Sequence, residues 1–320
     1  MSIIINNPVS NSRPNYFKNP AFSVIQGTAS GTLTNSLALP TASLGYPGES
    51  EWCIAASGGT PAYAFSTTNQ SLTLTGAAST TAIHVLQRIE SIDANRLASK
   101  QVTLSVEMSN SLLTFVTWEL FRPTTTANTH GTIASPTQTL IASGTWTVNS
   151  TLTRYSTTLT LPAEVSNGLE VRFRVAAQTS GTWVISRPKL EEGGSFTAFI
   201  SEDYSIELAK CQRYYEIMRF ATGVTIGVGT AGTTFSPPQA NGVYLRWKST
   251  KMSTPVASSS ASSTFVVASA TGTGSVGLSA DANGVALTIS ASSGSTGSNW
   301  TCVPVNASAN SFVAGASHIP

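Results

Sequence analysis

The sequence predicts an all-β protein made of antiparallel β-sandwiches. First, apolar and polar residues alternate in runs of strand length, as in "KQVTLSVEMS" at 100–109, where every second residue is apolar. Second, clusters of Gly, Pro and Asn separate these runs, with no helical segments between them. Third, Ser, Thr, Ala and Gly dominate and β-branched residues are interleaved among them, which favours strands with small polar outward faces.

The composition limits the possible functions. The chain has 320 residues, so two domains are the leading expectation and one large β domain is the alternative. Hydrophobic residues make up 41%, enough for a core, which excludes a disordered chain. Charged residues make up only 10%, the net charge is +2 and no basic patch stands out, so we expect no nucleic-acid partner.

Cysteine spacing and hydropathy give further expectations. Cys53, Cys211 and Cys302 lie far apart and form no CxxC pair, so we interpret them as small buried thiols and expect no metal and no cofactor. No stretch approaches the ~18 apolar residues of a membrane span, so we expect no membrane insertion. The opening "MSIIINNPVS" lacks a basic segment followed by a long apolar one. We therefore expect synthesis in a cytoplasm without export by a cleaved signal.

The first two segments are predicted from these patterns. Residues 1–18 are rich in Asn, Pro and Ser, which is typical of an extended arm that attaches to a larger assembly or of a frayed terminus. Residues 19–200 are predicted to form the first sandwich. Its clearest strands are expected within 100–109, 111–122, 153–162, 168–177 and 181–193.

Residues 201–220 are predicted to form a connecting helix. Ser201, Glu202 and Asp203 suit a helix start. Apolar residues then follow at spacings of four, three, four and three, which is one helical stripe and also the a/d pattern of a coiled-coil seam: Tyr204, Leu208, Cys211, Tyr215 and Met218. A helix of about four turns is not stable alone. We expect it to pack on its sandwich, on the next domain or on copies of itself.

Residues 221–320 are predicted to form a second, smaller β domain at the distal end. Asp281 is the only acidic residue after Lys251, and strand-like runs such as "GVALTIS" alternate with turn residues. So few charges would limit the solubility of an isolated domain, a difficulty that packing against neighbours or other copies would remove.

No catalytic motif is present, and we predict that the protein is not an enzyme. The three histidines lie apart, and no HExxH, GxSxG or P-loop pattern occurs. A glycosidase needs two carboxylates facing one bond. Glu191 and Glu192 are adjacent, so in a strand their side chains point to opposite faces and cannot form that pair.

Two aromatic residues are candidates for ligand contact. A Trp in an alternating strand is typical of a core. Trp300 differs because it follows the small-residue run "SSGSTGSN", so a loop could present it as a stacking surface for a sugar. Tyr46, beside Pro47 and Gly48, is a second candidate of the same kind.

Several stretches resemble a β-sandwich module of phage tail-fibre and virion appendage proteins. They are "NPAFSVIQG" at 19–27, "HVLQRIES" with "RLASKQVTLSVEMS" within 84–109, and "RPKLEEGGSFTAFISEDYSIELAKCQRYYE" at 187–216. The last is the most specific. "VYLRWKSTKMSTPVASSS" and "SFVAGASHIP" resemble strands of the small β domain that often follows, although Arg246–Trp247–Lys248 and Lys251–Met252 replace its usual Met-Arg.

The resemblance implies a carbohydrate-binding-module-like jelly roll, a connecting helix and a distal β domain in a homotrimeric fibre. It implies localisation in the virion, attachment to other virion proteins through residues 1–18, and adhesion to a host cell-surface glycan or protein. It transfers no binding residue. The alternatives are a purely structural virion component, such as a head fibre, decoration or baseplate protein, and an enzyme that trims surface polysaccharide.

Overall fold

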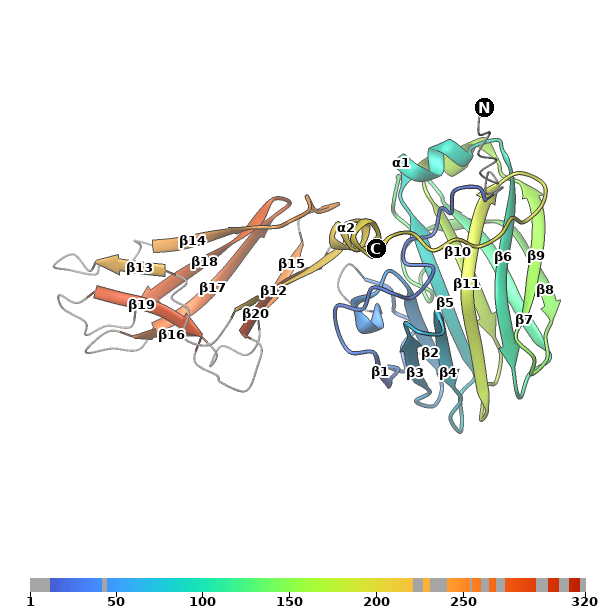
Figure 1. Cartoon of the computed structure of the whole chain (residues 1–320), viewed down its shortest axis with the longest axis horizontal. Coiled ribbons are helices and arrows are strands. Elements are labelled where there is room, and N and C mark those ends of the chain that lie inside the picture. The colour runs from blue at the N-terminus through green and yellow to red at the C-terminus, as the bar shows by residue number, and fades with distance from the viewer. Residues whose placement is uncertain are drawn as a thin grey trace, which may run out of the picture. The chain divides into compact units, whose positions relative to one another are not determined.

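The chain folds into two compact units, Met1–Glu207 with the last two residues, and Leu208–His318. A computed structural model describes residues 12–41, 45–220, 227–230, 241–253, 255–259, 265–268, 274–291, 299–304 and 311–316 (Figure 1). The two units are described separately.

The first unit is an antiparallel β-sandwich of two sheets stacked face to face (Figure 1). The six-stranded sheet has the order β1 (Ser30–Thr32), β3 (Ala62–Ser66), β4 (Ser71–Thr75), β11 (Thr182–Glu192), β6 (Gln101–Asn110), β9 (Thr153–Thr160). The five-stranded sheet has the order β2 (Cys53–Ser57), β5 (Ala82–Ile89), β10 (Leu169–Val175), β7 (Phe115–Pro123), β8 (Gln138–Thr147). Short helical turns are α1 (Ser91–Ala94), η1 (Pro47–Glu49), η2 (Asn95–Leu97) and η3 (Ala163–Asn167). The predicted jelly-roll-like sandwich is confirmed.

The core lies between the two sheets and follows the alternation of the sequence. Every second residue of β6 faces inward and is fully buried: Val102, Leu104, Val106 and Met108. Glu107, between the last two, faces outward and is partly exposed. Trp52 packs against Phe17 and Phe22 with ring centroids 5.1 and 5.6 Å away. Trp118, Trp146 and Trp183 lie in strands and are buried, as expected for Trp in alternating strands, and Trp52 and Trp247, each next to a strand, are buried as well.

The prediction of an extended arm over residues 1–18 is wrong for residues 12–18, because these residues pack on the first sandwich. The backbone N–H of Tyr16 donates to the Leu190 carbonyl (2.9 Å), and Phe17 is buried in the core. Apolar burial of Phe17 outweighs the loop-forming composition around it. Residues 1–11 lie outside the described residues.

The connecting helix is shorter than predicted. The helix α2 covers Tyr204–Gln212, and the chain then enters the strand β12 (Tyr215–Phe220). "YEIMRF" combines Tyr, Ile and Phe, which favour strands, and it pairs with β20 (Ser311–Ala316). Tyr215 and Met218 therefore lie in a strand, and the five predicted residues do not form one helical stripe. Within the described residues, no helix has the length and hydropathy needed to cross a bilayer.

The second unit begins at Leu208 rather than at 221, so it includes the end of α2, and its other described elements are β-strands, as predicted. Its described residues form three antiparallel sheets of three strands each. Their orders are β12–β20–β15 (Val256–Ser259), β13 (Gly227–Thr230)–β19 (Asn299–Pro304)–β16 (Phe265–Ala268), and β14 (Asn241–Arg246)–β18 (Gly284–Ala291)–β17 (Gly274–Asp281). Within this unit a buried ion pair joins Lys251 Nζ to Glu216 Oε2 at 3.1 Å, and Lys251 also lies over the Trp247 ring.

Candidate functional site: a polar pocket with aromatic walls

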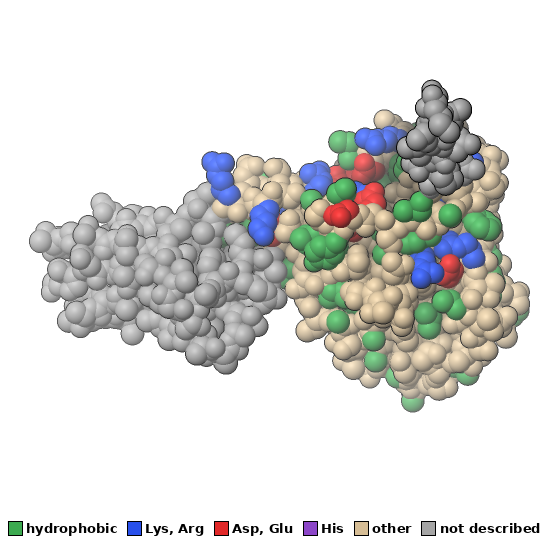
Figure 2. All heavy atoms as spheres, viewed as in Figure 1, with side chains coloured by type: hydrophobic (Ala, Val, Ile, Leu, Met, Phe, Trp, Pro, Cys, Tyr) green, Lys and Arg blue, Asp and Glu red, His purple; other side chains and the backbone are tan. Residues whose placement is uncertain are grey.

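A pocket of about 470 Å³ lies on the outer face of the six-stranded sheet. Figure 2 shows a small group of basic and acidic side chains on this face, over β11 and β6. The residues that line the pocket come from five separate parts of the sequence: Gln70, Glu107, Arg154, Arg187, Phe196, Thr197, Ala198, Phe199 and Ser201.

The charged part of the pocket is a carboxylate between two guanidinium groups. Glu107 on β6 stands directly opposite Arg154 on the neighbouring strand β9. Arg154 Nη2 donates to Glu107 Oε1 at 3.1 Å, and Arg187 Nη1 donates to Glu107 Oε2 at 3.3 Å. Arg154 also donates to Ser105 Oγ at 3.0 Å and to the Arg187 carbonyl at 3.3 Å. These contacts hold three planar polar groups side by side.

A β-bulge in β11 positions Arg187. The register of β11 against β6 shifts between Ser186 and Lys189. Within the bulge Arg187 has a φ of 47°, which is rare for a residue other than glycine and is further disfavoured before Pro188. Bulges redirect side chains in this way, and strained backbone concentrates at functional sites.

Gln70 joins the strand part of the pocket to the segment that forms its wall. It lies in the turn between β3 and β4 with a φ of 53°. Its side-chain oxygen accepts from Arg187 Nε at 2.8 Å, and its amide nitrogen donates to Ser201 Oγ at 2.8 Å. The two contacts fix which end of the amide faces each neighbour.

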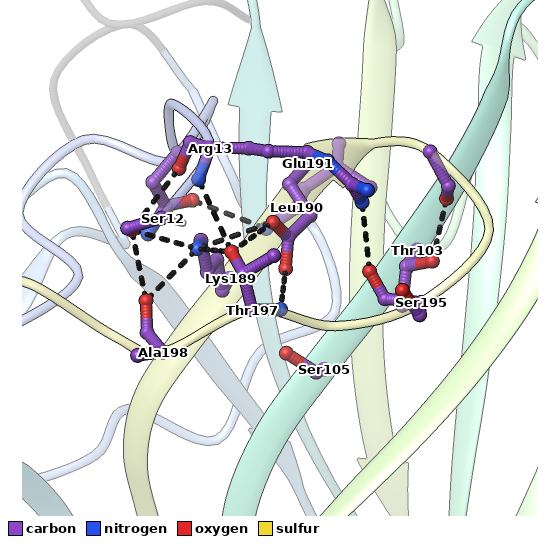
Figure 3. Close-up of polar contacts among 12 residues, drawn as sticks. Ser12, Arg13, Thr103, Ser105, Lys189, Leu190, Glu191, Ser195, Thr197 and Ala198 are labelled. Atoms are coloured by element: carbon purple, nitrogen blue, oxygen red, sulfur yellow. Dashed lines mark hydrogen bonds and ion pairs between the residues drawn. The ribbon is translucent and has the colours of Figure 1, made fainter. Parts of the chain in front are cut away.

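The wall is formed by residues 195–201, which we call the strap. Phe196 is 51% exposed and Phe199 is partly exposed, so each presents an open ring surface. The strap crosses the outer face of β11 and β6 (Figure 3). Its two aromatic rings are the apolar part of a pocket whose other side chains are mainly polar.

A buried ion pair on β11 holds the strap in place. Lys189 and Glu191 are 1% and 0% exposed at their side chains, with Lys189 Nζ 3.2 Å from Glu191 Oε2. Glu191 Oε1 accepts from the Thr197 backbone N–H at 2.7 Å, and Lys189 donates to the Ala198 carbonyl at 3.1 Å. Figure 3 shows these contacts converging on the strap.

The N-terminal segment reinforces the strap from its other side. Ser12 Oγ donates to the Ala198 carbonyl at 2.8 Å, and Lys189 Nζ donates to Ser12 Oγ at 3.2 Å. Arg13 Nη1 donates to the Ser195 carbonyl at 2.9 Å (Figure 3). The wall of the pocket thus depends on a segment almost 200 residues earlier in the chain.

Of the two residues predicted to contact ligand, Tyr46 does not line this pocket. Tyr46 is only 7% exposed and packs with Cys53 and Leu86, and burial raises the pKa of its phenol well above the usual value. Its ring packs in this small cluster and is too buried to stack on a ligand, so the prediction for Tyr46 is wrong. Trp300 lies in β19, with its backbone opposite Gly229. Its side chain lies outside the described residues, so that prediction stays open.

A second charged cluster lies on the outer face of the five-stranded sheet, and its side chains are buried. Glu170 is fully buried, and it accepts from Arg88 Nε at 2.8 Å and from Arg172. Burial alone would raise the pKa of Glu170, but Arg88 and Arg172 lower it to about 2. Arg88 Nη2 also donates to the Gly131 carbonyl at 2.6 Å, which ties a loop to the sheet.

Two neutral histidines adjoin that cluster. Burial, with the positive charges of nearby arginines, lowers the pKa of His84 to about 3. Burial also lowers the pKa of His130 to about 4, and its Nδ1 lies 3.1 Å from Gln138 Oε1. In the part of the chain that the structure describes, no three His, Cys, Asp or Glu side chains are grouped to hold a metal ion.

Comparisons with known proteins give a likeness in fold. No protein-family model matches the chain, and no curated protein matches it. A CBM4 structure has 14% identity and a TM-score of 0.34, covering 53% of this chain and 100% of its own. TmCBM61 in complex with β-1,4-galactotriose has 10% identity and a TM-score of 0.32, covering 56% and 99%.

A phage protein is also among the similar structures. The enzymatically active domain of tailspike protein 4 of bacteriophage CBA120 has 16% identity and a TM-score of 0.32, covering 49% of this chain and 21% of that chain. Scores and identities this low identify no ligand. The function must therefore be inferred from the residues of the pocket.

Proposed function

We propose that the chain is a bacteriophage tail-fibre or related virion appendage protein that adheres to a host-surface glycan without catalysis. The observation that carries glycan binding is the pocket on the outer face of the six-stranded sheet. Its volume of about 470 Å³ lies within the roughly 300–1,000 Å³ usual for small-ligand sites. It suits one or two sugar residues.

The lining chemistry fits a sugar. A pyranose ring has an apolar face of C–H groups that can pack on an aromatic ring, and Phe196 offers an exposed ring. Sugar hydroxyls both donate and accept, so they pair with guanidinium, carboxylate and amide groups alike. Arg187, Glu107 and Gln70 supply one of each.

Non-catalytic binding is supported by the carboxylate content of the pocket. Glu107 is the only carboxylate among the residues that line it, all of which the structure describes. Both of its oxygens are engaged by arginines. Glycoside hydrolysis ordinarily needs a second carboxylate across the scissile bond.

The virion setting is supported by the sequence resemblance over residues 19–216. In a homotrimer, three copies of a shallow pocket would act together, and several fibres per virion would multiply the effect. Linked weak sites gain about 100- to 10,000-fold in avidity.

The test is a glycan array probed with the full chain, its Phe196→Ala variant and a Phe115→Ala control. Phe115 is 58% exposed and lies on β7, away from the pocket. We expect Phe196→Ala to lose most of the signal and Phe115→Ala to keep it. If Phe196→Ala leaves binding intact, the pocket is not the glycan-binding site. Release of reducing sugar would overturn the non-catalytic role. Co-assembly with a capsid or baseplate protein and no glycan binding would favour a purely structural virion component.

A further inference from the structure

The pocket carries an excess of positive charge. Arg154 and Arg187 are its only cationic lining residues, and Glu107 is its only anionic one. Glu107 divides its two oxygens between the two arginines. One positive charge therefore remains uncompensated within the pocket.

The free charge resides on Arg187 rather than on Arg154. Arg154 is largely buried, and its two Nη atoms are bonded to Ser105, to Glu107 and to the Arg187 carbonyl. Arg187 is 39% exposed at its side chain. It uses Nε for Gln70 and Nη1 for Glu107, and no acceptor in the described part of the chain bonds its Nη2.

The orientation of Arg187 is imposed by its backbone and by its neighbours. The bulge holds it at a φ of 47°, and Gln70 and Glu107 accept from Nε and Nη1, which leaves the Nη2 donors on the outer edge of the guanidinium. A guanidinium held in this way presents a preorganised fork of N–H donors, which matches a planar two-oxygen acceptor. Preorganisation reduces the entropy lost when a ligand binds.

From this geometry we propose that the pocket binds an acidic sugar, whose carboxylate pairs with the outer edge of Arg187 while its ring packs on the aromatic strap. This inference rests on the proposed glycan binding. A uronic or sialic acid supplies one negative charge, which matches the one uncompensated positive charge. A phosphomonoester carries close to two negative charges at neutral pH, one of which would face Glu107 without a partner.

The experiment compares acidic glycans with their carboxyl-reduced forms, in which each carboxylate becomes a hydroxymethyl group. The array also carries sulfated and phosphorylated glycans. We expect the full chain to bind uronate- or sialate-containing glycans, and carboxyl reduction to weaken binding about 10- to 100-fold, the range for losing one charge-assisted hydrogen-bonded pair. Binding to the acidic forms should weaken as salt is raised.

The matched variants are Arg187→Gln and Arg174→Gln. Arg174 is 38% exposed at its side chain, lies on the other sheet and pairs loosely with Glu119 at 3.8 Å, so it controls for general loss of charge. We expect Arg187→Gln to abolish the preference for acidic over reduced glycan and Arg174→Gln to keep it. Arg187→Lys should retain only part of the preference, because an ammonium lacks the planar fork.

Failure of this inference is distinguishable from failure of the proposed function. Equal binding of acidic and reduced glycans, lost in Phe196→Ala, would overturn the acidic-sugar assignment and leave glycan binding in place. Binding restricted to sulfated or phosphorylated glycans would also overturn the inference that the acidic group of the ligand is a carboxylate. Absence of any Phe196-dependent binding would overturn both.

Discussion

The Glu207 carboxylate accepts a hydrogen bond of 2.6 Å from the backbone N–H of Asn19, which lies 188 residues earlier in the chain. Asn19 is buried with a φ of 51°, its side chain bonds both the N–H and the carbonyl of Val24, and its carbonyl accepts from Trp52 Nε1. Both residues belong to stretches that resemble phage appendage proteins. Their contact ties the first turn of α2 to the start of the first sandwich.

Replacing Glu207 should destabilise the first unit. In Glu207→Ala the buried N–H of Asn19 loses its acceptor, which costs about 1–3 kcal/mol. Glu207→Gln keeps an oxygen acceptor and should cost less. The exposed Glu202→Ala is the control and should change stability by less than about 0.5 kcal/mol. Urea unfolding gives the free energies, and hydrogen exchange at residues 19–24 locates the effect. Equal stability of Glu207→Ala and the wild-type chain would show that this contact is dispensable.

The sandwich could be predicted from sequence because apolar residues that face the core alternate with polar residues that face away from it. The "KQVTLSVEMS" stretch and the strand Leu169–Val175 show this alternation of residue types, although outer-face residues such as Ser105 and Glu170 are themselves buried. The end of the helix could not be placed, because Tyr215 satisfies both a helical spacing and a strand alternation. Pairing of β12 with β20, almost 100 residues later, decides between them.

The pocket was missed for a related reason. Gln70, Glu107, Arg154 and Arg187 lie on four separate strands or turns, and only the register of the sheet brings them together. One local signal was available in "GGSFTAF", two phenylalanines in an otherwise small and polar stretch after a strand. The buried Lys189 and Glu191 could not be recognised, since charged residues in a strand ordinarily indicate a solvent-facing side.

Acidification should destabilise the first unit below about pH 6.5. His84 and His130 are neutral when folded, with pKa values of about 3 and 4, whereas an unfolded histidine titrates near 6.5. The unfolded chain therefore binds more protons as pH falls. Stability that is complete above pH 6.5 declines by up to about 1.4 kcal/mol per pH unit for each histidine. Glu170, with a pKa of about 2, adds a further loss between roughly pH 4.5 and 2.

Urea midpoints at pH 7, 5.5 and 4 test this expectation, with His130→Gln as the comparison. Glutamine cannot gain a proton, so the variant should lose less stability between pH 6.5 and 4 than the wild-type chain. A wild-type stability that is constant from pH 7 to 4 would contradict neutral buried histidines.

Neutralising both members of the Lys189–Glu191 pair should be less harmful than neutralising lysine alone. Lys189→Met leaves the Glu191 carboxylate buried without its cation, which costs about 3–5 kcal/mol. Adding Glu191→Gln removes that buried charge, so the double variant should be more stable than Lys189→Met. Both variants should expose the strap to hydrogen exchange at residues 195–201 and weaken glycan binding. A double variant less stable than Lys189→Met would refute this coupling.

The Arg187→Gly variant should be at least as stable as the Arg187→Ala variant. This is the reverse of the usual order in a strand, where alanine is more stabilising than glycine. Glycine adopts a positive φ without strain, whereas alanine retains the strain of about 1–3 kcal/mol. Both variants lose the same arginine contacts, so their difference isolates the backbone. Val184, outward-facing on the same strand, is the control site, where Gly should be about 0.5–1 kcal/mol worse than Ala. Thermal melts of the four variants provide the comparison, and both position-187 variants should lose preference for acidic glycan. Alanine more stable than glycine at both sites would remove the strain argument.

The proposed homotrimer can be tested by a direct mass measurement. Because the five residues of the predicted stripe do not lie on one helix, a trimer would need a contact surface other than that complete stripe. Ile200, Tyr204 and Ile206 are each more than half exposed within seven residues. We expect light scattering at several concentrations to give three times the 33.3 kDa chain mass, and Ile206→Asp to reduce it. Ile92→Asp, at a position 67% exposed elsewhere on the first unit, should leave the mass unchanged. A wild-type monomer would remove the avidity argument and leave a single adhesive module or a protein that assembles only on its virion.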